Sequence, residues 1–481
     1  MTWIRFLSVC CLSFVLAASA ADELAGKRPN IVFILTDDQG YGDMSCHGNP
    51  LLKTPALDKL HSESVRFTDF HVSPTCAPTR AALLTGRHEF RNGVTHTILE
   101  RERLTLQATT LAQVLKSAGY TTGIFGKWHL GDEDEYQPER RGFDEVFIHG
   151  GGGIGQSYPG SCGDAPKNKY FDPAIKHNGK FVKTAGYCTD VFFEQAAKWV
   201  ESVKGRQPFF CYLPTNAPHD PLHVPPEYNK LYADQVPADT AKFFGMIANL
   251  DDNVAKLMAK LSAWGIERET LVIFMNDNGG TYGVKVFNAG MREKKGTPWL
   301  GGTRVASFWR WPGTLKPADV SKLTAHIDFL PTIAEITGAK LSDETKAQIE
   351  GRSLVPLLVN SAAPWEDRTL FTHVGRWPKL EPPATYKYTN CSVRNTRWHM
   401  VSVAKKNEKQ WQLFDLTTDP GEKTDLAAQN PQVVAELESA YDKWWDSVQP
   451  QLVNEKAPGP KINPFKEQYE KQFGAVDVPK Q

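Results

Sequence analysis

Four short apolar runs, each ending abruptly in polar side chains, constrain the fold of this chain more than any other feature. They are NIVFILTDDQG (30–40), GYTTGIFGKWHLG (119–131), QPFFCYLPTNAPHDPLH (207–223) and TLVIFMNDNGG (270–280). The runs are continuous rather than alternating, which is typical of strands buried on both faces of a sheet. They therefore predict a sheet that is covered by helices on both sides.

Helical patterns lie between these runs, at 109–119, 189–205 and 238–265. Strands that alternate with helices predict an α/β fold with a large, mostly parallel central sheet flanked by helices. In such sheets the ligand site lies beyond the carboxyl ends of the strands. Each polar cluster that ends an apolar run falls at such a position. The glycine run 149–160 lacks the pattern of a phosphate loop, and we expect it to be a flexible loop.

The composition changes after residue 360, where short runs rich in Trp and Tyr begin. Residues 391–403 and 409–426 have the pattern of strands, and residues 431–448 have that of a helix. We therefore predict a main domain at 21–360 and a smaller C-terminal α+β subdomain with an antiparallel sheet at 361–481. The tail after Pro458 is rich in Pro and Lys, and we expect it to pack loosely.

The first twenty residues have the pattern of a secretory signal peptide. Arg5 precedes the apolar run 6–17, and Ala18-Ser19-Ala20 supplies the small residues of a cleavage site. The run is too short for a membrane anchor, and the sequence contains no other transmembrane candidate. We predict an exported protein, periplasmic or secreted. A single glycosylation acceptor, at Asn390, favours a bacterial exported protein over a lysosomal one.

Export places the remaining cysteines in an oxidising compartment. Cys162 and Cys188 flank a loop-like segment and are the best candidates for a disulfide, whereas Cys211 has the surroundings of a buried core thiol. Lys plus Arg and Asp plus Glu both number 55, so the net charge is zero. This balance gives no support to binding of nucleic acid.

Two pairs of oxygen-bearing side chains follow two of the predicted strands. Asp37-Asp38 ends the first run and Asp277-Asn278 ends the last. Either pair alone could be a helix cap or a turn. Taken together, both at strand ends, they favour a site for a hard cation such as Ca²⁺ or Mg²⁺.

The segment SPTCAPTRAALLTGR (73–87) places Cys76 at the entrance of a predicted helix, close to Arg80. Such a position could lower the pKa of a thiol and make it a nucleophile. Thiolate enzymes need a histidine base, however, and this segment contains none. Ordinary cysteine chemistry therefore does not explain Cys76.

The segment resembles the signature of the sulfatase family, Cys-x-Pro-x-Arg with a Thr-Gly-Arg tail. Other family landmarks follow in family order: NIVFILTDDQGYGD (30–43), GKWHLG (126–131), PHDPLH (218–223), DNGG (277–280), KKGTPWLGGTRV (294–305) and LFDLTTDPGEKTDL (413–426). The resemblance covers residues 29 to about 445. It points to the arylsulfatase A-like, formylglycine-dependent type I sulfatases, which belong to the alkaline-phosphatase-like superfamily.

The resemblance implies a modified residue and one metal ion. Cys76 would be oxidised to Cα-formylglycine by a formylglycine-generating enzyme, and the aldehyde would hydrate to a geminal diol. One Ca²⁺ ion per chain would be held by the modified residue and by four further ligands: Asp37, Asp38, Asp277 and Asn278. The cation would lower the pKa of a diol hydroxyl and make it a nucleophile.

The resemblance also implies roles for five other side chains. Arg80 would steady the diol, Lys127 would bind sulfate oxygens, and His129 would take the proton of the second diol hydroxyl. His219, the best candidate for the general acid, and Lys295 would lie near the leaving oxygen. Each could be an ordinary surface charge or a structural histidine, but their joint occurrence in family order favours the site.

For the substrate, we expect a sulfated carbohydrate rather than a small aryl sulfate. His149 and His223 lie in loops near the predicted strand ends and are candidates for substrate contacts, although His223 could equally pack structurally. Two alternatives remain open. One is a phosphate or phosphonate ester hydrolase of the same superfamily, which Asn278 disfavours because those enzymes usually have a histidine there. The other is a non-catalytic protein that binds sulfate esters.

Overall fold

The computed structural model describes residues 24–476. The signal peptide predicted at 1–20 lies outside the described residues. Among the helices of residues 24–476, none combines the length and the apolar character needed to cross a membrane.

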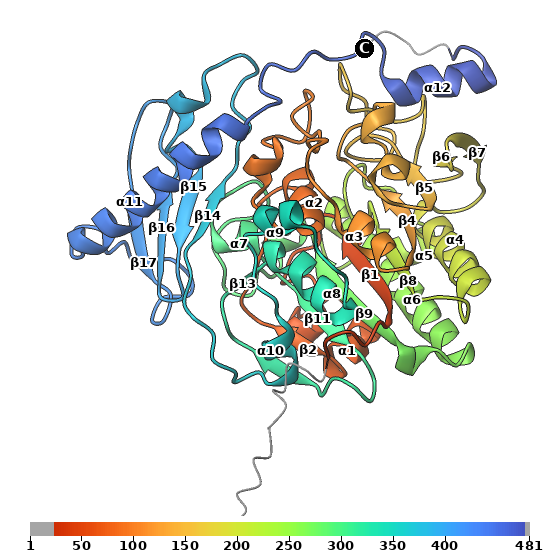
Figure 1. Ribbon diagram of the computed structural model, residues 1–481, viewed down its shortest axis with the longest axis horizontal. Helices are drawn as coiled ribbons and strands as arrows, with labels where there is room; N and C mark the ends of the chain where they lie inside the picture. Colours follow the sequence, from red (N-terminus) through yellow and green to blue (C-terminus); the bar gives the residue numbers. More distant parts are fainter. Residues whose placement is uncertain (1–23, 477–481) are drawn as a thin grey trace, which may run out of the picture.

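A large mixed sheet forms the centre of the molecule (Figure 1). Within residues 24–476 it has ten strands, listed here from one edge to the other: β12 (Ala318–Val320), β2 (Val65–Phe67), β11 (Ser307–Arg310), β9 (Thr270–Asn276), β1 (Asn30–Thr36), β8 (Phe209–Pro214), β4 (Thr121–Lys127), β5 (Glu145–His149), β6 (Ala174–His177) and β7 (Lys180–Lys183). The five neighbours from β9 to β5 all pair in parallel, whereas β11, β6 and β7 run antiparallel to their partners. The prediction of a mostly parallel sheet is confirmed.

Strand β1 shows why the apolar runs are continuous. Ile31, Phe33 and Leu35 face one core, whereas Val32 and Ile34 face a second core on the opposite side of the sheet. Both faces are covered, so no position of the strand needs a polar side chain.

Helices cover both faces of this sheet. One face packs against α2 (Cys76–Thr85), α3 (Leu111–Ser117), α8 (Phe329–Thr337) and α10 (Val355–Val359), and the other against α1 (Pro55–Ser62), α4 (Cys188–Val203) and α6 (Ala238–Ala263). The remaining short helices are α5 (Pro226–Asn229), α7 (Leu300–Thr303) and α9 (Asp343–Gln348). The three helices predicted from the sequence are confirmed as α3, α4 and α6. A small sheet joins β10 (Arg304–Val305), β3 (Phe70–His71) and β13 (Thr324–Ala325).

The C-terminal subdomain contains the predicted antiparallel sheet. Its strands, in spatial order, are β14 (Leu370–His373), β15 (Cys391–Arg394), β16 (Trp398–Ser402) and β17 (Gln412–Asp415). Helix α11 (Pro431–Val448) packs on this sheet through Tyr441, Trp444 and Trp445, in a core separate from those of the large sheet.

The tail after Pro458 packs more closely than we expected. Helix α12 (Pro464–Phe473) lies beside β6 and β7, across the molecule from α11 (Figure 1). Phe465 is 1% exposed and belongs to a core of the large sheet. The side-chain amide of Gln472 donates to the Phe181 carbonyl and accepts from the Phe181 N–H, at 2.7 and 2.8 Å. The composition of the tail did not reveal this anchoring because it depends on single residues.

The predicted disulfide is wrong. Within the described part of the chain every cysteine is free, and Cys162 and Cys188 are both buried. Each thiol donates to its own acceptor: Cys162 Sγ to the Thr97 carbonyl at 3.5 Å, and Cys188 Sγ to Asn216 Oδ1 at 3.2 Å. Cys211 is a fully buried core residue, as predicted.

Candidate active site

The carboxyl ends of four parallel strands bring together most of the residues singled out in the sequence. Asp37 and Asp38 follow β1, and Asp277 and Asn278 follow β9, which pairs directly with β1. His219 lies in the loop after β8, the other neighbour of β1. The order of the sheet therefore explains how segments more than 200 positions apart form one site.

The acidic residues form a buried cluster at this edge of the sheet. Asp37 and Asp277 are fully buried, and Asp38 is nearly so. The Asp38 N–H lies 3.3 Å from Asp277 Oδ1, and Asn278 Nδ2 donates to Asp38 Oδ1 at 3.0 Å. Asp37 Oδ1 and Asn278 Oδ1 are both buried without a hydrogen-bond partner. A buried oxygen atom without a hydrogen-bond partner costs free energy, so these two atoms indicate that a ligand or cation binds here.

The charges around the cluster divide the carboxylates into two kinds. Burial works to raise the pKa of Asp37, but Lys127, His219 and Arg80 outweigh it and hold the pKa well below its usual range. Burial and the negative charge of Asp37 raise the pKa of Asp277, although Arg80 opposes them. Of the two, Asp277 is thus the carboxylate whose negative charge its surroundings stabilise less.

A Ca²⁺ ion fits this donor set. The two unpartnered oxygens and the neighbouring carboxylates are all hard oxygen ligands, which calcium prefers. A divalent cation would also neutralise the charge that raises the pKa of Asp277. The residues that would hold the ion are Asp37, Asp38, Asp277 and Asn278.

Helix α2 begins at Cys76, which is 2% exposed. The preceding residue, Thr75, has an extended backbone, and its side chain does not cap the helix. The first amides of the helix are therefore free of a side-chain cap, and with the helix dipole they favour an anion at this end.

Arg80 lies one turn further along α2 and is fully buried. Its Nε and Nη2 donate to Asp277 Oδ2 at 3.2 and 2.8 Å, and Nη1 donates to the Lys127 carbonyl at 3.0 Å. Arg80 thus ties α2 to the ends of β4 and β9. Its hydrogen bonds go to the cluster carboxylate and to the backbone, and its expected role of steadying the diol stays a prediction.

Two lysines contact the carboxylates of the cluster. Lys127 Nζ, at the end of β4, lies 2.5 Å from Asp37 Oδ2 and is fully buried. Lys295 Nζ lies 2.5 Å from Asp38 Oδ1, and its side chain is 13% exposed. The backbone of the Lys295 loop is held at Pro74, whose carbonyl accepts from the Gly296 N–H at 2.8 Å. The loop of Lys295 is thus fixed to the segment that leads into Cys76.

The two histidines of the site each turn one ring nitrogen to a backbone carbonyl. His129 Nε2 lies 2.7 Å from the Thr97 carbonyl, and its Nδ1 is buried without a partner. Burial and Lys127 lower the pKa of His129 well below its usual value, so Nδ1 is an unprotonated acceptor. His219 Nδ1 lies 2.7 Å from the Asp220 carbonyl, which leaves Nε2 facing Asp38 Oδ2 at 3.9 Å.

The glycine run that we expected to be a flexible loop packs against both histidines. A Cβ atom built on Gly152 would lie 2.9 Å from His129 Nε2, and one on Gly153 would lie 3.1 Å from His219 Nδ1. The Asp132 carboxylate accepts from the Gly151 N–H at 3.3 Å and holds the run in place. Sequence reasoning missed these glycines as site residues. Their signal is a close backbone approach, which requires glycine for a reason other than phosphate binding.

A buried carboxylate supports the segment before α2. Ser73 Oγ donates to Glu89 Oε1 at 2.5 Å, and Glu89 Oε2 lies 3.6 Å from His88 Nδ1 and 3.5 Å from His326 Nε2. Burial works to raise the pKa of Glu89, but the two histidines and Ser73 outweigh it and lower the pKa to about 2.

Of the two candidate substrate residues, His149 lies beside Lys127 of the site and His223 lies at the surface. His149 is fully buried at the end of β5, in register with Lys127, and its Nδ1 donates to the Gly150 carbonyl at 2.9 Å. His223 is exposed and lines a surface hollow of about 430 Å³ together with Phe171 and Lys242. Neither forms a hydrogen bond with the carboxylates or lysines of the site.

Comparison with known proteins decides the family. The family model described as Sulfatase matches residues 29–339, and the model described as N-sulphoglucosamine sulphohydrolase, C-terminal, matches residues 301–445. The chain belongs to the sulfatase family. It is a sulfuric ester hydrolase, as the sequence resemblance predicted.

Other sulfatases match along most of their length. Human (Homo sapiens) arylsulfatase A is 31% identical, over 88% of this chain and 89% of the relative. Mouse (Mus musculus) arylsulfatase J is 28% identical, over 85% of this chain and 75% of the relative. Among solved structures, the complex of Ps i-CgsB with k-i-k-neocarrahexaose superposes with a TM-score of 0.76 at 29% identity, covering 87% of this chain and 92% of that chain. The fold is thus the alkaline-phosphatase-like fold of sulfatases.

Proposed function

We propose that this sulfatase is an exported enzyme that removes sulfate from sulfated carbohydrates, with Cα-formylglycine at position 76 and one Ca²⁺ ion. The observation that carries the proposal is that Cys76 begins α2, the helix whose Arg80 donates to Asp277 of the buried carboxylate cluster that Lys127 and Lys295 also contact. The Gly296 N–H donates to the Pro74 carbonyl at 2.8 Å, so the loop that carries Lys295 packs against the segment that leads into Cys76. We assign catalysis to the domain at 21–360, with 361–481 as the C-terminal subdomain.

The bound Ca²⁺ ion would supply Lewis-acid stabilisation of negative charge at the reacting oxygens. The chain's own residues supply binding and proton transfer. The Lys127 and Lys295 ammonium groups and the free amides at the start of α2 offer positive charge and N–H donors to the sulfate oxygens. These groups stabilise the sulfate most when its oxygens gain charge during transfer.

Residue 76, as the hydrated aldehyde, provides two hydroxyl groups on one carbon. One hydroxyl releases its proton to solvent, and its oxygen forms a bond to sulfur while the bond from sulfur to the ester oxygen breaks, and the alcohol leaves. His219 Nε2 faces the site and donates the proton that the alcohol takes. His219 must be doubly protonated for this step, and the negative charge of a bound sulfate ester favours that form.

The second step restores the aldehyde. His129 Nδ1 accepts the proton of the second hydroxyl, the carbon–oxygen double bond forms, and the bond to the sulfated oxygen breaks, which releases sulfate. His129 suits this role because Nδ1 has no other partner and the lowered pKa keeps the ring neutral. The cycle uses one water molecule, which hydrates the aldehyde again.

The names of two relatives support a carbohydrate substrate. The structure of Ps i-CgsB, 29% identical to this chain, holds an oligosaccharide, k-i-k-neocarrahexaose. Mouse N-acetylgalactosamine-6-sulfatase is 28% identical over 84% of this chain. Export, to the periplasm or the medium, rests on the predicted signal peptide at 1–20. Maturation requires a formylglycine-generating enzyme as a partner.

The proposal is tested by expressing the chain with a formylglycine-generating enzyme and measuring the mass of the peptide that contains Cys76. We expect a loss of about 18 Da, the difference between thiol and aldehyde. The same preparation should release sulfate from an aryl sulfate and from a panel of sulfated sugars, and activity should fall when Ca²⁺ is chelated. Cys76→Ala is the matched control for both measurements.

Two outcomes would contradict the proposal. Full conversion of Cys76 without sulfate release from any ester would favour the sulfate-ester-binding alternative. Faster turnover of phosphate or phosphonate esters than of sulfate esters would favour the other hydrolase class.

A further inference from the structure

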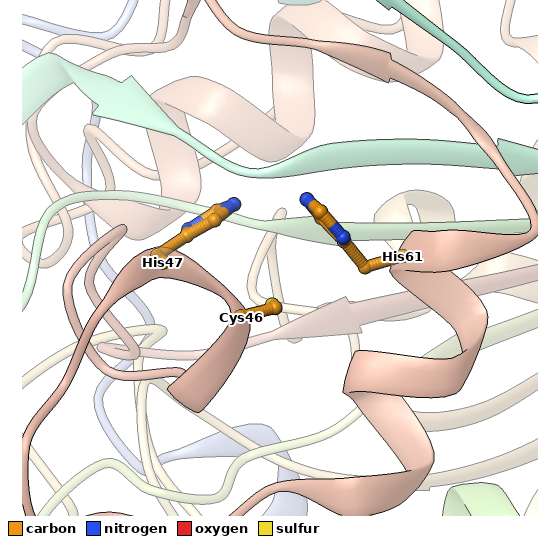
Figure 2. Close-up of side chains that lie close together, drawn as sticks. All are labelled: Cys46, His47 and His61. Carbon is orange, nitrogen blue, oxygen red and sulfur yellow. The ribbon is translucent and has the colours of Figure 1, made fainter.

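A second group of metal-ligand side chains lies outside the active site. Cys46 and His47 belong to the short helix η2 (Ser45–His47), and His61 lies in the last turn of α1. One ligand atom from each residue, the sulfur or a ring nitrogen, lies within 4.8 Å of the other two. Figure 2 shows the two imidazole rings turned toward each other, with Cys46 beside the gap between them.

The His47 ring is held in one orientation. Its Nδ1 lies 2.7 Å from the Tyr41 carbonyl, so Nδ1 carries the proton and Nε2 presents its lone pair. Metal-binding histidines commonly donate their other ring N–H to a carbonyl in this way. Tyr41 stacks on the ring with centroids 3.8 Å apart, and the edge of Phe308 fixes both imidazoles, at 5.5 Å from His47 and 5.1 Å from His61.

The two imidazoles are available as neutral ligands, whereas burial and the Asp58 carboxylate raise the pKa of the Cys46 thiol, so a cation there must displace its proton. Burial lowers the pKa of His47 to about 4, so the ring is neutral at pH 7. Burial, together with Arg66, also lowers the pKa of His61. Cys46 is a free thiol, and the Asp58 carboxylate lies next to it, accepting from the Cys46 N–H at 2.9 Å. The negative charge of Asp58 would favour a cation at the sulfur.

We propose that Cys46, His47 and His61 bind a zinc ion, with the Cys46 thiol releasing its proton to solvent as the sulfur–zinc bond forms. One sulfur and two imidazole nitrogens are a ligand set that zinc takes and calcium does not. Usual zinc bond lengths at a tetrahedral angle place ligand atoms about 3.5 Å apart. The three atoms already lie within 4.8 Å of one another, so shifts of no more than about 1 Å close the site. All three residues are partly exposed, so a water molecule can complete the site.

The zinc site would join two segments near the catalytic carboxylates. Tyr41, whose carbonyl orients His47, follows the Asp37-Asp38 pair by three residues, and His61 belongs to a helix on the face of the sheet. The ion would therefore brace the loop after β1 against α1. This role is structural, and it is independent of the proposed sulfate chemistry.

The test is a titration of the full chain with Zn²⁺. Bound metal ions are first removed with a chelator, and excess Ca²⁺ is then added to occupy the carboxylate cluster. We expect one tight zinc site in the parent protein. Changes to partners of metal ligands cost roughly 10–100-fold in affinity, so loss of a direct ligand in Cys46→Ser or His61→Asn should cost about 100-fold or more. His177→Asn is the matched control, because His177 is partly exposed and pairs with Glu145 instead.

Cobalt provides the second readout, because a cysteine thiolate bound to Co²⁺ gives a charge-transfer band in the near ultraviolet. The band should persist in Cys76→Ala and vanish in Cys46→Ser. Its absence from the parent protein at one equivalent of Co²⁺, or its survival in Cys46→Ser, would overturn the proposal. Melting curves of the metal-free variants identify any that fail to fold. If Cys46→Ser fails to fold, the His61→Asn variant still tests the proposal, because His61 lies at a partly exposed end of α1.

Discussion

The glycine run beside the two histidines gives a sharp test of how closely His129 must be placed. Substitution of Gly152 by Ala adds one methyl group and removes no functional group. Its Cβ would lie 2.9 Å from His129 Nε2, whereas ordinary contacts begin at 3.4 Å. The ring or the loop must therefore move by about 0.5 Å, the tolerance within which a catalytic geometry is held.

The expected loss follows from this displacement. A misplacement of 1 Å can cost about 100-fold in rate, so a shift of half that size should cost about 10-fold in kcat. The shift also strains the 2.7 Å hydrogen bond from His129 to the Thr97 carbonyl. KM should change less than kcat, because the lysines and the α2 amides that bind sulfate do not touch Gly152.

Steady-state kinetics on an aryl sulfate, with calcium in excess and with formylglycine content measured by mass, provides the assay. Gly421→Ala is the control, since its added Cβ would meet the flexible Lys423 side chain at 3.2 Å, remote from His129. Both variants should keep the melting temperature of the parent within a few degrees. If Gly152→Ala retained kcat within about twofold while remaining folded, the role given to His129 would be refuted.

Three further predictions concern the rest of the molecule. Glu89→Gln should lower the free energy of unfolding by up to about 3 kcal/mol, since the pKa falls from 4.5 to about 2 on folding. The pKa of Glu89 is lower in the folded protein than in the unfolded one, so the loss of stability should be complete above pH 4.5 and should disappear as the pH falls through about 2. Urea titrations across this pH range measure the loss. An equal loss at the high and the low end of the range would contradict the prediction. Phe465→Ala should cost about 3–5 kcal/mol, whereas Phe473→Ala, 42% exposed, should cost roughly 0.5 kcal/mol, as measured by denaturant unfolding. Cys162 and Cys188 should both react with a thiol reagent in the denatured, unreduced protein, and recovery of a linked peptide pair would contradict the structure.

Much of the fold follows from the sequence because its strands are buried on both faces. Continuous apolar runs such as 30–36 and 270–276 can be recognised without knowing their neighbours, and the helices between them have a clear period. The anchoring of the tail could not be predicted in this way. It depends on Phe465 entering a core formed by residues nearly 300 positions earlier, and composition does not report single contacts.

The candidate site was predictable where chemistry fixes residue types. Asp37-Asp38 and Asp277-Asn278 stand at strand ends in the sequence and meet in the structure. The role of Gly152 could not be predicted, because a close backbone approach leaves no mark except the glycine itself. The hydrogen bonds of Arg80 could not be predicted either. Its position one helical turn after Cys76 does not determine which carboxylate its guanidinium contacts.

The pairing of Gln472 with Phe181 has a consequence for the behaviour of the chain in solution. Strand β7 is an edge of the large sheet, and an edge with free N–H and carbonyl groups can recruit a strand from another molecule. The Gln472 amide occupies both groups of Phe181, as a neighbouring strand would. Helix α12 thus keeps this edge of the sheet from pairing with a strand of another molecule, which would lead to aggregation. Since Gln472 is synthesised nearly 300 residues after Phe181, this edge of the sheet stays open until that segment has been translated.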